Sequence, residues 1–258
     1  MAGSAAADTR YRYYNRRFER ALPGMDLLLD AFAVVDCGMA QAIAHRGQKP
    51  ACGAGCYHCC TQPIPLTPLE VLGLRIFMGP ELVSGHAAAP ALRHEQQGVA
   101  PASGSGTGSV PGSVTDSVTG GASACMWAAS DHVLGLAADV RQQLAARLAA
   151  FGGKTENLGA TCPFLHEGRC AVYPVRPMAC RRYIVYGVPC AQGEDPTCTR
   201  PHQVLQPGQD FLQAALRHTL PWYRGRYPLP DQPSADETQA FFRSVTTVLQ
   251  AVPWARYV

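Results

Sequence analysis

Four cysteines lie within nine residues of this chain, at Cys52, Cys56, Cys59 and Cys60. That density is too high for core packing to explain, and the four are too close together in sequence for all of them to form disulfides with one another. A second cysteine-rich stretch begins about a hundred residues later. Its members are Cys162, Cys170, Cys180, Cys190 and Cys198. We therefore expect the fold to bring two irregular cysteine-rich loops together at a metal site.

The expected cellular location supports metal over disulfides. Residues 1–20 lack the apolar region of a secretory signal and carry arginines where that region should be. No run of eighteen apolar residues is found in the sequence, so we expect no membrane-spanning segment and a cytoplasmic location. In a reducing cytosol, clustered cysteines are more often metal ligands or redox groups than disulfides. The alternatives are a redox dithiol without metal and a disulfide framework, which the odd total of 11 cysteines makes awkward.

The composition is that of a protein with a substantial core. The chain has 258 residues, of which 47% are hydrophobic, so it does not need metal or disulfides merely to fold. The net charge of +3 is too small to indicate binding to nucleic acid or to a membrane. We expect neither kind of partner, and the sequence identifies no protein partner.

Helical patterns dominate the sequence, and we expect a mainly α fold. Residues 25–47 carry the broad apolar face of a core helix, with Cys37 inside that face and outside the metal site. A clear helix start follows the first cysteine stretch. Thr67 suits the N-cap and Glu70 completes a capping box, which predicts a helix over residues 68–78.

Three further helices are predicted in the second half of the chain. The first covers residues 127–151 and the second lies near residues 209–218. The third opens with a capping box formed by Ser234 and Glu237. Its expected apolar face consists of Phe241, Phe242, Val245, Val248 and Leu249.

The chain divides around a segment without helical or strand-like spacing. Residues 100–124 are dominated by small residues and Pro, so we expect a flexible insertion, with a lid over the site as the alternative. Residues 1–99 and 125–258 each supply helices and one cysteine cluster, and we expect them to pack as one domain. Within the first part, residues 10–22 predict an amphipathic helix, docked on the core or, alternatively, gripping single-stranded nucleic acid. Cys125 lies outside both clusters.

Paired motifs in residues 52–72 and 161–183 are similar to a known family. CxxxCxxCC is followed by I-x-L-T-x-x-E, and later by CPFL, C-x-V-Y and R-P-x-x-C-R. The pair resembles the CxxCxxCC cysteine-cluster family of YkgJ-like proteins, which are described as zinc- or iron-chelating or iron–sulfur cluster proteins. In this chain the first gap is three residues rather than two. The resemblance implies seven ligands: Cys52, Cys56, Cys59, Cys60, Cys162, Cys170 and Cys180. It also implies that Arg176 and Pro177 shape the motif.

The donor set favours a soft metal. Thiolates bind zinc and iron–sulfur clusters in preference to magnesium or calcium. More than four cysteines are available, and Cys162-Pro163 resembles the Cys-Pro ending of ferredoxin-type runs, so an iron–sulfur cluster is preferred and zinc is the alternative. Cys190 and Cys198 are second-tier ligand candidates. His58 and His166 are possible zinc ligands.

Positive charge is expected around the sulfurs. Four thiolates around zinc or a [4Fe–4S] core leave a net charge of about −2, which is costly to bury unpaired. Arg176 and Arg181 lie inside the second motif and are expected to contact the cofactor. Three more arginines that could offset this charge are Arg169, Arg182 and Arg200.

Two function hypotheses follow from these residues. The first is an iron–sulfur cluster protein with a redox or cluster-dependent role. The second is a zinc-binding structural or metal-handling module without catalysis. We expect the metal to be shared between the two cysteine stretches, because nothing else explains why both motifs occur in one chain. The sequence contains no motif that identifies a reaction.

Overall fold

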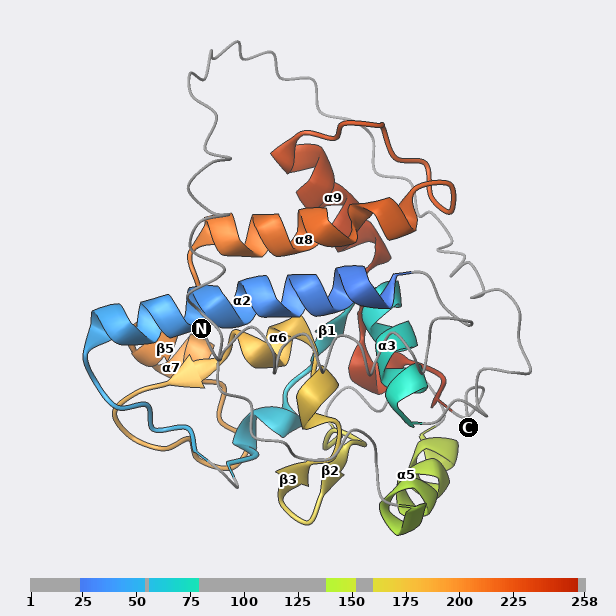
Figure 1. Ribbon diagram of the computed structural model, residues 1–258. Helices are drawn as coiled ribbons and strands as arrows, with labels where there is room; N and C mark the ends of the chain where they lie inside the picture. The colour runs from blue at the N-terminus through green and yellow to red at the C-terminus, as the bar shows by residue number, and fades with distance from the viewer. Residues whose placement is uncertain (1–23, 54–55, 79–137, 152–159, 255–258) are drawn as a thin grey trace, which may run out of the picture.

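A computed structural model describes residues 24–53, 56–78, 138–151 and 160–254. This part of the chain contains seven α-helices and only small sheets (Figure 1), so the predicted mainly α class is confirmed. The expected helix at residues 10–22, the insertion at 100–124 and Cys125 lie outside the described residues. The helices are α2 (Met25–Arg46), α3 (Pro68–Met78), α5 (Ala138–Ala150), α6 (Met178–Arg181), α7 (Pro196–Thr199), α8 (Gln209–Tyr223) and α9 (Ala235–Val245).

The described residues contain three pairs of very short antiparallel strands, two of which join separate loops. β1 (Pro65–Leu66) pairs with β6 (Thr247–Val248), which fastens the C-terminal region beside the first cysteine stretch. β4 (Ile184–Val185) pairs with β5 (Val204–Leu205). The third pair is the hairpin of β2 (Leu165–His166) and β3 (Arg169–Cys170), whose turn contains a left-handed glycine at Gly168.

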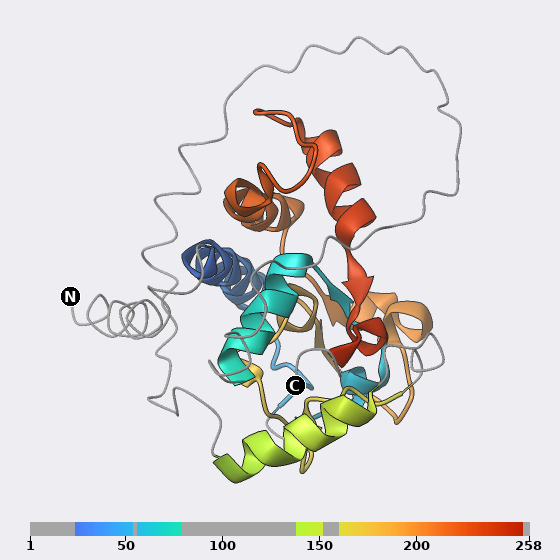
Figure 2. The same ribbon diagram turned by 90° about the vertical axis from the view of Figure 1, so that its right-hand side faces the viewer.

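The long helix α2 lies at the centre of the fold. α8 runs alongside it in the opposite direction, while α3 and α6 lie on the other side (Figure 1). Gly38 in the middle of α2 permits this close approach, because a Cβ there would meet Cγ of Phe211 at 2.6 Å. Gly73 permits α3 to approach α2 closely, since a Cβ there would meet Cδ2 of Leu28 at 2.5 Å. Figure 2 views α2 and α8 nearly end-on, with α3 below and beside α2 and α5 at the bottom of the picture.

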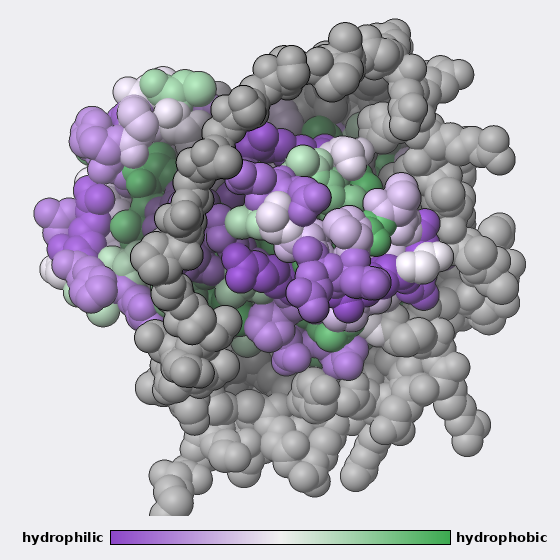
Figure 3. Space-filling model, turned by 90° about the horizontal axis from the view of Figure 1, so that it is seen from above, coloured by the Kyte–Doolittle hydropathy of each residue, from purple (hydrophilic) through white to green (hydrophobic). Residues whose placement is uncertain are grey.

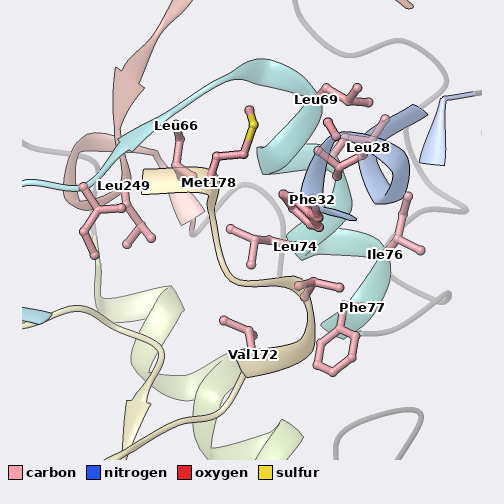
Figure 4. Packing of buried hydrophobic residues seen from close by; sticks show 14 of the residues in the cluster. Leu28, Phe32, Leu66, Leu69, Leu74, Ile76, Phe77, Val172, Met178 and Leu249 are labelled. Carbon is pink, nitrogen blue, oxygen red and sulfur yellow. The ribbon is translucent and has the colours of Figure 1, made fainter. Parts of the chain in front are cut away.

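The main hydrophobic core joins α2 and α3 to the second cysteine stretch. Figure 4 shows side chains from both helices packed near Val172 and Met178, which belong to that stretch. Leu66 from β1 and Leu249 from the C-terminal region close the core on another side. At about 25 cal/mol per Å² of buried apolar area, such packing is the principal favourable term in folding. The core therefore supports the second cysteine stretch on the side that faces α2 and α3.

Helix α2 is long and apolar enough to cross a membrane by length and composition, since its most apolar window has a mean hydropathy of 1.6. The absence of a membrane-spanning segment therefore stays a prediction. Core helices meet the same test, and the position of α2 between α8 and α3 is that of a core helix. In the view from above, over α8 and α9, hydrophilic residues predominate among the described residues and apolar patches are small (Figure 3).

Two helix ends differ from the sequence prediction. α8 continues to Tyr223, beyond the predicted residue 218 and through Pro221, because Trp222 and Tyr223 are buried in the core. α9 ends at Val245. Val248 therefore lies in β6 and Leu249 in the following 3₁₀ turn, because pairing with β1 replaces the last helical turn.

The predicted capping box at the start of α3 is present and has a second role. Glu70 Oε2 accepts hydrogen bonds from the backbone N–H of Thr67 at 2.8 Å and from its hydroxyl at 2.9 Å. Glu70 Oε1 accepts a 2.7 Å hydrogen bond from the backbone N–H of Met178, the first residue of α6. One buried carboxylate thus caps two helices from different halves of the chain. Burial raises the pKa of Glu70, while the three donors at Thr67 and Met178 favour its charged form.

Replacing Glu70 with Ala should destabilise the protein by at least about 2 kcal/mol, because buried N–H groups at Thr67 and Met178 lose their acceptor. Glu70→Gln keeps one carbonyl oxygen and should cost less. The measurement is the free energy of unfolding in denaturant.

Glu237 provides a matched control, because it forms the same local capping box with Ser234 at the exposed start of α9. Glu237→Ala should cost about 1 kcal/mol. If the two alanine variants lose equal stability, the bond from Glu70 to Met178 contributes nothing.

Candidate metal centre

The two cysteine stretches meet through backbone hydrogen bonds. The N–H of Cys162 donates to the carbonyl of Cys60 at 2.7 Å. At the other end of the first stretch, the N–H of Ala51 donates to the carbonyl of Val185 at 2.8 Å, and the N–H of Val185 donates to Cys52 Sγ at 3.2 Å. Residues about a hundred positions apart in sequence are therefore neighbours in the fold.

Short local elements set the position of most candidate thiols. Cys59 and Cys60 lie in a 3₁₀ turn, His58–Thr61, directly before β1. Cys170 ends β3, and Cys180 lies in α6, whose first N–H is held by Glu70. The nine predicted ligands are all free thiols. Cys162 and Cys190 are buried, Cys198 is exposed, and the other six are partly buried.

Burial makes most of these thiols poor acids. It is the largest cause of the raised pKa of Cys162, to about 12, and of Cys52, to about 11. Burial also raises the pKa of Cys170, Cys180 and Cys190, and the negative charge of Cys59 adds to the increase at all five.

Cys59 and Cys60 form a coupled pair. A side-chain hydrogen bond from Cys60 lowers the pKa of Cys59 to about 7, and the same bond raises the pKa of Cys60. Without metal, Cys59 is therefore the thiol of this pair that ionises first. Because the thiolate is the reactive form of cysteine, Cys59 is the more reactive thiol of the pair.

The thiols do not form a finished metal site in the part of the chain that the structure describes. No group of three or more His, Cys, Asp or Glu side chains there is arranged to hold a metal ion. Metal binding would have to draw the sulfurs closer together. Cys198 stands apart from the other predicted ligands: it is exposed, and its thiol donates to Asp195 Oδ2 at 3.5 Å.

Arg181 is engaged by protein groups. Its guanidinium donates to Asp36 Oδ2 on α2 at 2.6 Å, and to the carbonyls of Pro174 at 2.6 Å and Arg176 at 2.9 Å. It also lies over the ring of Phe32, 4.0 Å from the centroid. Arg181 therefore fastens the second cysteine stretch to α2, and its charge lowers the pKa of Cys170 only as a minor cause after burial and other contacts.

Arg176 is available to the thiols. Its guanidinium stacks on the exposed ring of Tyr173 at 4.0 Å, and its buried Nε has no hydrogen-bond partner. Its positive charge acts to lower the pKa of Cys59, Cys170 and Cys180, against the larger effects of hydrogen bonding and burial. Its Nε–H is thus a buried donor that no described protein group accepts.

The two histidines also differ in whether their ring nitrogens have a protein partner. His58 lies between Cys56 and Cys59, stacks on Tyr57 with ring centroids 5.1 Å apart, and has a buried Nδ1 without a partner. His166 lies in β2, with Nε2 4.0 Å from Glu167. Unpartnered buried nitrogens on His58 and Arg176, set among soft thiol donors, fit an anionic metal–thiolate group.

The sequence did not indicate several residues that shape this region. Asp36 on α2 pairs with Arg181, and Glu194 pairs with Arg200 at 2.8 Å. Gln62 donates to the carbonyl of Glu194 at 2.9 Å, which adds another link between the stretches. No spacing in the sequence predicts the contacts of Asp36 and Gln62, because their partners lie 145 and 132 positions away in the chain.

Comparisons of this chain with protein-family models, curated proteins and solved structures find no match. The resemblance of the cysteine motifs to the YkgJ-like family therefore stays a prediction.

The two motif arginines should respond differently to substitution. Arg181→Lys should destabilise the metal-free protein by about 2 kcal/mol or more, because lysine cannot serve Asp36 and two carbonyls together. Arg176→Gln should change that stability by less than about 1 kcal/mol and should instead speed metal loss to a chelator. Unfolding in denaturant and chelator kinetics measure the two effects. The assignment is wrong if Arg176→Gln is the more destabilising change.

Glu194 should produce a pH dependence of stability at acid pH. The side-chain hydrogen bond from Arg200, followed by bonds from Ala191 and Thr199, lowers its pKa from 4.5 to about 2. A lowered pKa in the folded state stabilises the fold fully above about pH 4.5 and loses this contribution as the pH falls toward about 2.

The Glu194→Gln variant should therefore lose stability less steeply over that pH range than the unaltered protein. Unfolding free energies at several pH values test this, with exposed Asp231→Asn as the control. If the free energy of unfolding falls equally steeply with pH in all three proteins, the lowered pKa of Glu194 is contradicted.

Proposed function

We propose that this protein binds metal through cysteines of both stretches, and that the bound group is an iron–sulfur cluster with a redox or cluster-dependent role. The observation that carries the proposal is that the two cysteine stretches are joined by hydrogen bonds from the N–H of Cys162 to the carbonyl of Cys60 and from the N–H of Val185 to Cys52 Sγ. Eight of the nine free thiols are buried or partly buried, and such an arrangement is useful where thiols ionise together on a metal.

The residues that would hold the group are cysteines of both stretches. Arg176 Nε and His58 Nδ1 are the polar atoms left to hydrogen-bond its sulfur atoms. When bound, an iron–sulfur cluster supplies one-electron chemistry. The chain's own contribution is to shield most of the sulfurs partly or fully from water and to place positive charge at Arg176, which would offset the negative charge of the bound group.

The type of donor supports iron–sulfur over zinc, because nearly all candidate donors are sulfur. The competing proposal is a zinc-binding structural or metal-handling module without catalysis. His58 supports it, because its unpartnered Nδ1 is a suitable zinc ligand. For either function we propose a cytoplasmic location, where the thiols would stay reduced.

Anaerobic purification followed by metal analysis separates the two proposals. We expect a brown protein with visible absorption, iron and acid-labile sulfide. Cys162→Ser should lose that absorption, because Cys162 is buried at the junction of the stretches, while exposed Cys198→Ser should keep it.

A colourless protein containing zinc would establish the alternative. If the protein binds neither iron nor zinc, as purified or after reconstitution, both proposals are contradicted.

A further inference from the structure

Prolines on both sides of Ile64 limit how the chain that leaves the first cysteine stretch can be held. Pro63 and Pro65 have no backbone N–H, so Ile64 has the only N–H of the three. Ile64 is buried, and a buried N–H needs an acceptor. That acceptor is the side chain of Gln250, whose Oε1 lies 3.2 Å from the nitrogen of Ile64. A residue from the C-terminal region therefore completes the hydrogen bonding of the chain just after Cys60.

Gln250 uses both ends of its amide on this run of residues. Its Nε2 donates to the carbonyl of Gln62, two residues after Cys60, at 2.7 Å. The N–H of the neighbouring Leu249 donates to the carbonyl of Ile64, also at 2.7 Å. Gln250 is fully buried, so water cannot replace either partner of its amide. Together with the β1–β6 pair, these bonds fix the run that follows the first cysteine stretch (Figure 2).

The same C-terminal region also holds the second cysteine stretch. Trp254 is fully buried, and its ring packs edge-on against Phe164 with the ring centroids 5.1 Å apart. Phe164 is itself buried and lies two residues after Cys162. The indole N–H of Trp254 donates to the carbonyl of Leu249 at 2.9 Å, which ties the ring to the 3₁₀ turn that contains Gln250. Gln250 and Trp254 therefore belong to one connected unit.

These contacts flank the junction of the two cysteine stretches. At the junction, the N–H of Cys162 donates to the carbonyl of Cys60 at 2.7 Å. Two residues beyond each of these cysteines, Gln62 and Phe164 contact residues 247–254. One C-terminal segment therefore supports both partners of the junction hydrogen bond.

We propose that residues 247–254, the C-terminal clamp, are a positioning element of the metal centre. Gln250 and Trp254 keep the two cysteine stretches in contact at Cys60 and Cys162, and thereby slow the loss of a bound metal. This inference rests on the proposed metal-binding function. The clamp contains no cysteine or histidine, so it acts on the centre only by holding the chain on either side of it.

The clamp matters because the junction lies in irregular loops. Regions with few supporting contacts open locally, and a hydrogen bond between two loops opens with them. Opening here would leave the amide of Gln250 and the carbonyl of Gln62 buried without partners, which is costly. A metal held by cysteines of both stretches can leave only when the stretches separate, so its rate of loss should follow the opening of the junction.

Hydrogen exchange of the Cys162 N–H in the metal-free, full-length protein tests the clamp, because it reports how often the junction opens. Gln250→Met keeps a side chain of similar length and removes both hydrogen bonds. It should raise the exchange rate of this N–H about tenfold, and by more than it raises the rates of the slowest N–H groups of α2. Trp254→Phe repeats the test at the other contact, in case Gln250→Met fails to fold.

Leu220→Ala is the control, because Leu220 is buried in α8, outside the clamp and both cysteine stretches. It should lower the stability of the whole fold and raise the exchange rates of Cys162 and of α2 together. A change confined to general stability would therefore look the same in the control and in the clamp variants.

Loss of bound iron or zinc to a chelator, from the anaerobically prepared protein, tests the consequence. Gln250→Met and Trp254→Phe should lose metal about tenfold faster than the unaltered protein, whereas Leu220→Ala should lose it at nearly the unaltered rate.

The outcomes separate the clamp from the proposed function. If the clamp variants raise the exchange of Cys162 no more than that of α2, or lose metal at the unaltered rate, the clamp proposal is overturned while metal binding stands. A protein that binds no metal, as purified or after reconstitution, would overturn the proposed function itself.

Discussion

The arrangement of the cysteine loops depends on the buried carboxylate of Glu70. It accepts hydrogen bonds from Thr67 at the start of α3 and from Met178 at the start of α6, so it joins the supports of both cysteine stretches. A buried carboxylate is stable only when its oxygens are satisfied, and here the N-termini of two helices supply the donors and favourable dipoles. α6 is only four residues long and could not hold Cys180 in place unaided.

A second buried contact completes the support from the other side. Arg181 follows Cys180 directly and binds Asp36 on the central helix α2. Glu70 and Arg181 therefore hold the two ends of α6 against α3 and α2. With these polar groups satisfied by the protein, Arg176 and His58 keep buried nitrogens directed toward no protein acceptor. The structure thus separates polar groups that the scaffold uses from these two nitrogens, which no described protein group pairs.

Local signals in the sequence predicted the elements that local physics controls. The helix over residues 68–78 and its capping box were predicted to the residue, because caps satisfy N–H groups within one turn. The core helix at residues 25–47 and the capping box at Ser234 were also predicted correctly. The end of α9 was not, because β6 forms by pairing with β1 about 180 residues earlier in the chain, and no nearby residue signals that contact.

The sequence alone determined that this is a mainly helical protein with two concentrated groups of thiols, because helical periodicity and cysteine spacing are written in consecutive residues. Tertiary structure decided which thiols are neighbours. It attached Cys52 to β4 and Cys60 to Cys162, placed Cys198 at the surface, and gave Arg176 and Arg181 different roles. Those outcomes depend on hydrogen bonds between residues far apart in the chain, and such bonds form only once the hydrophobic core has brought their segments together.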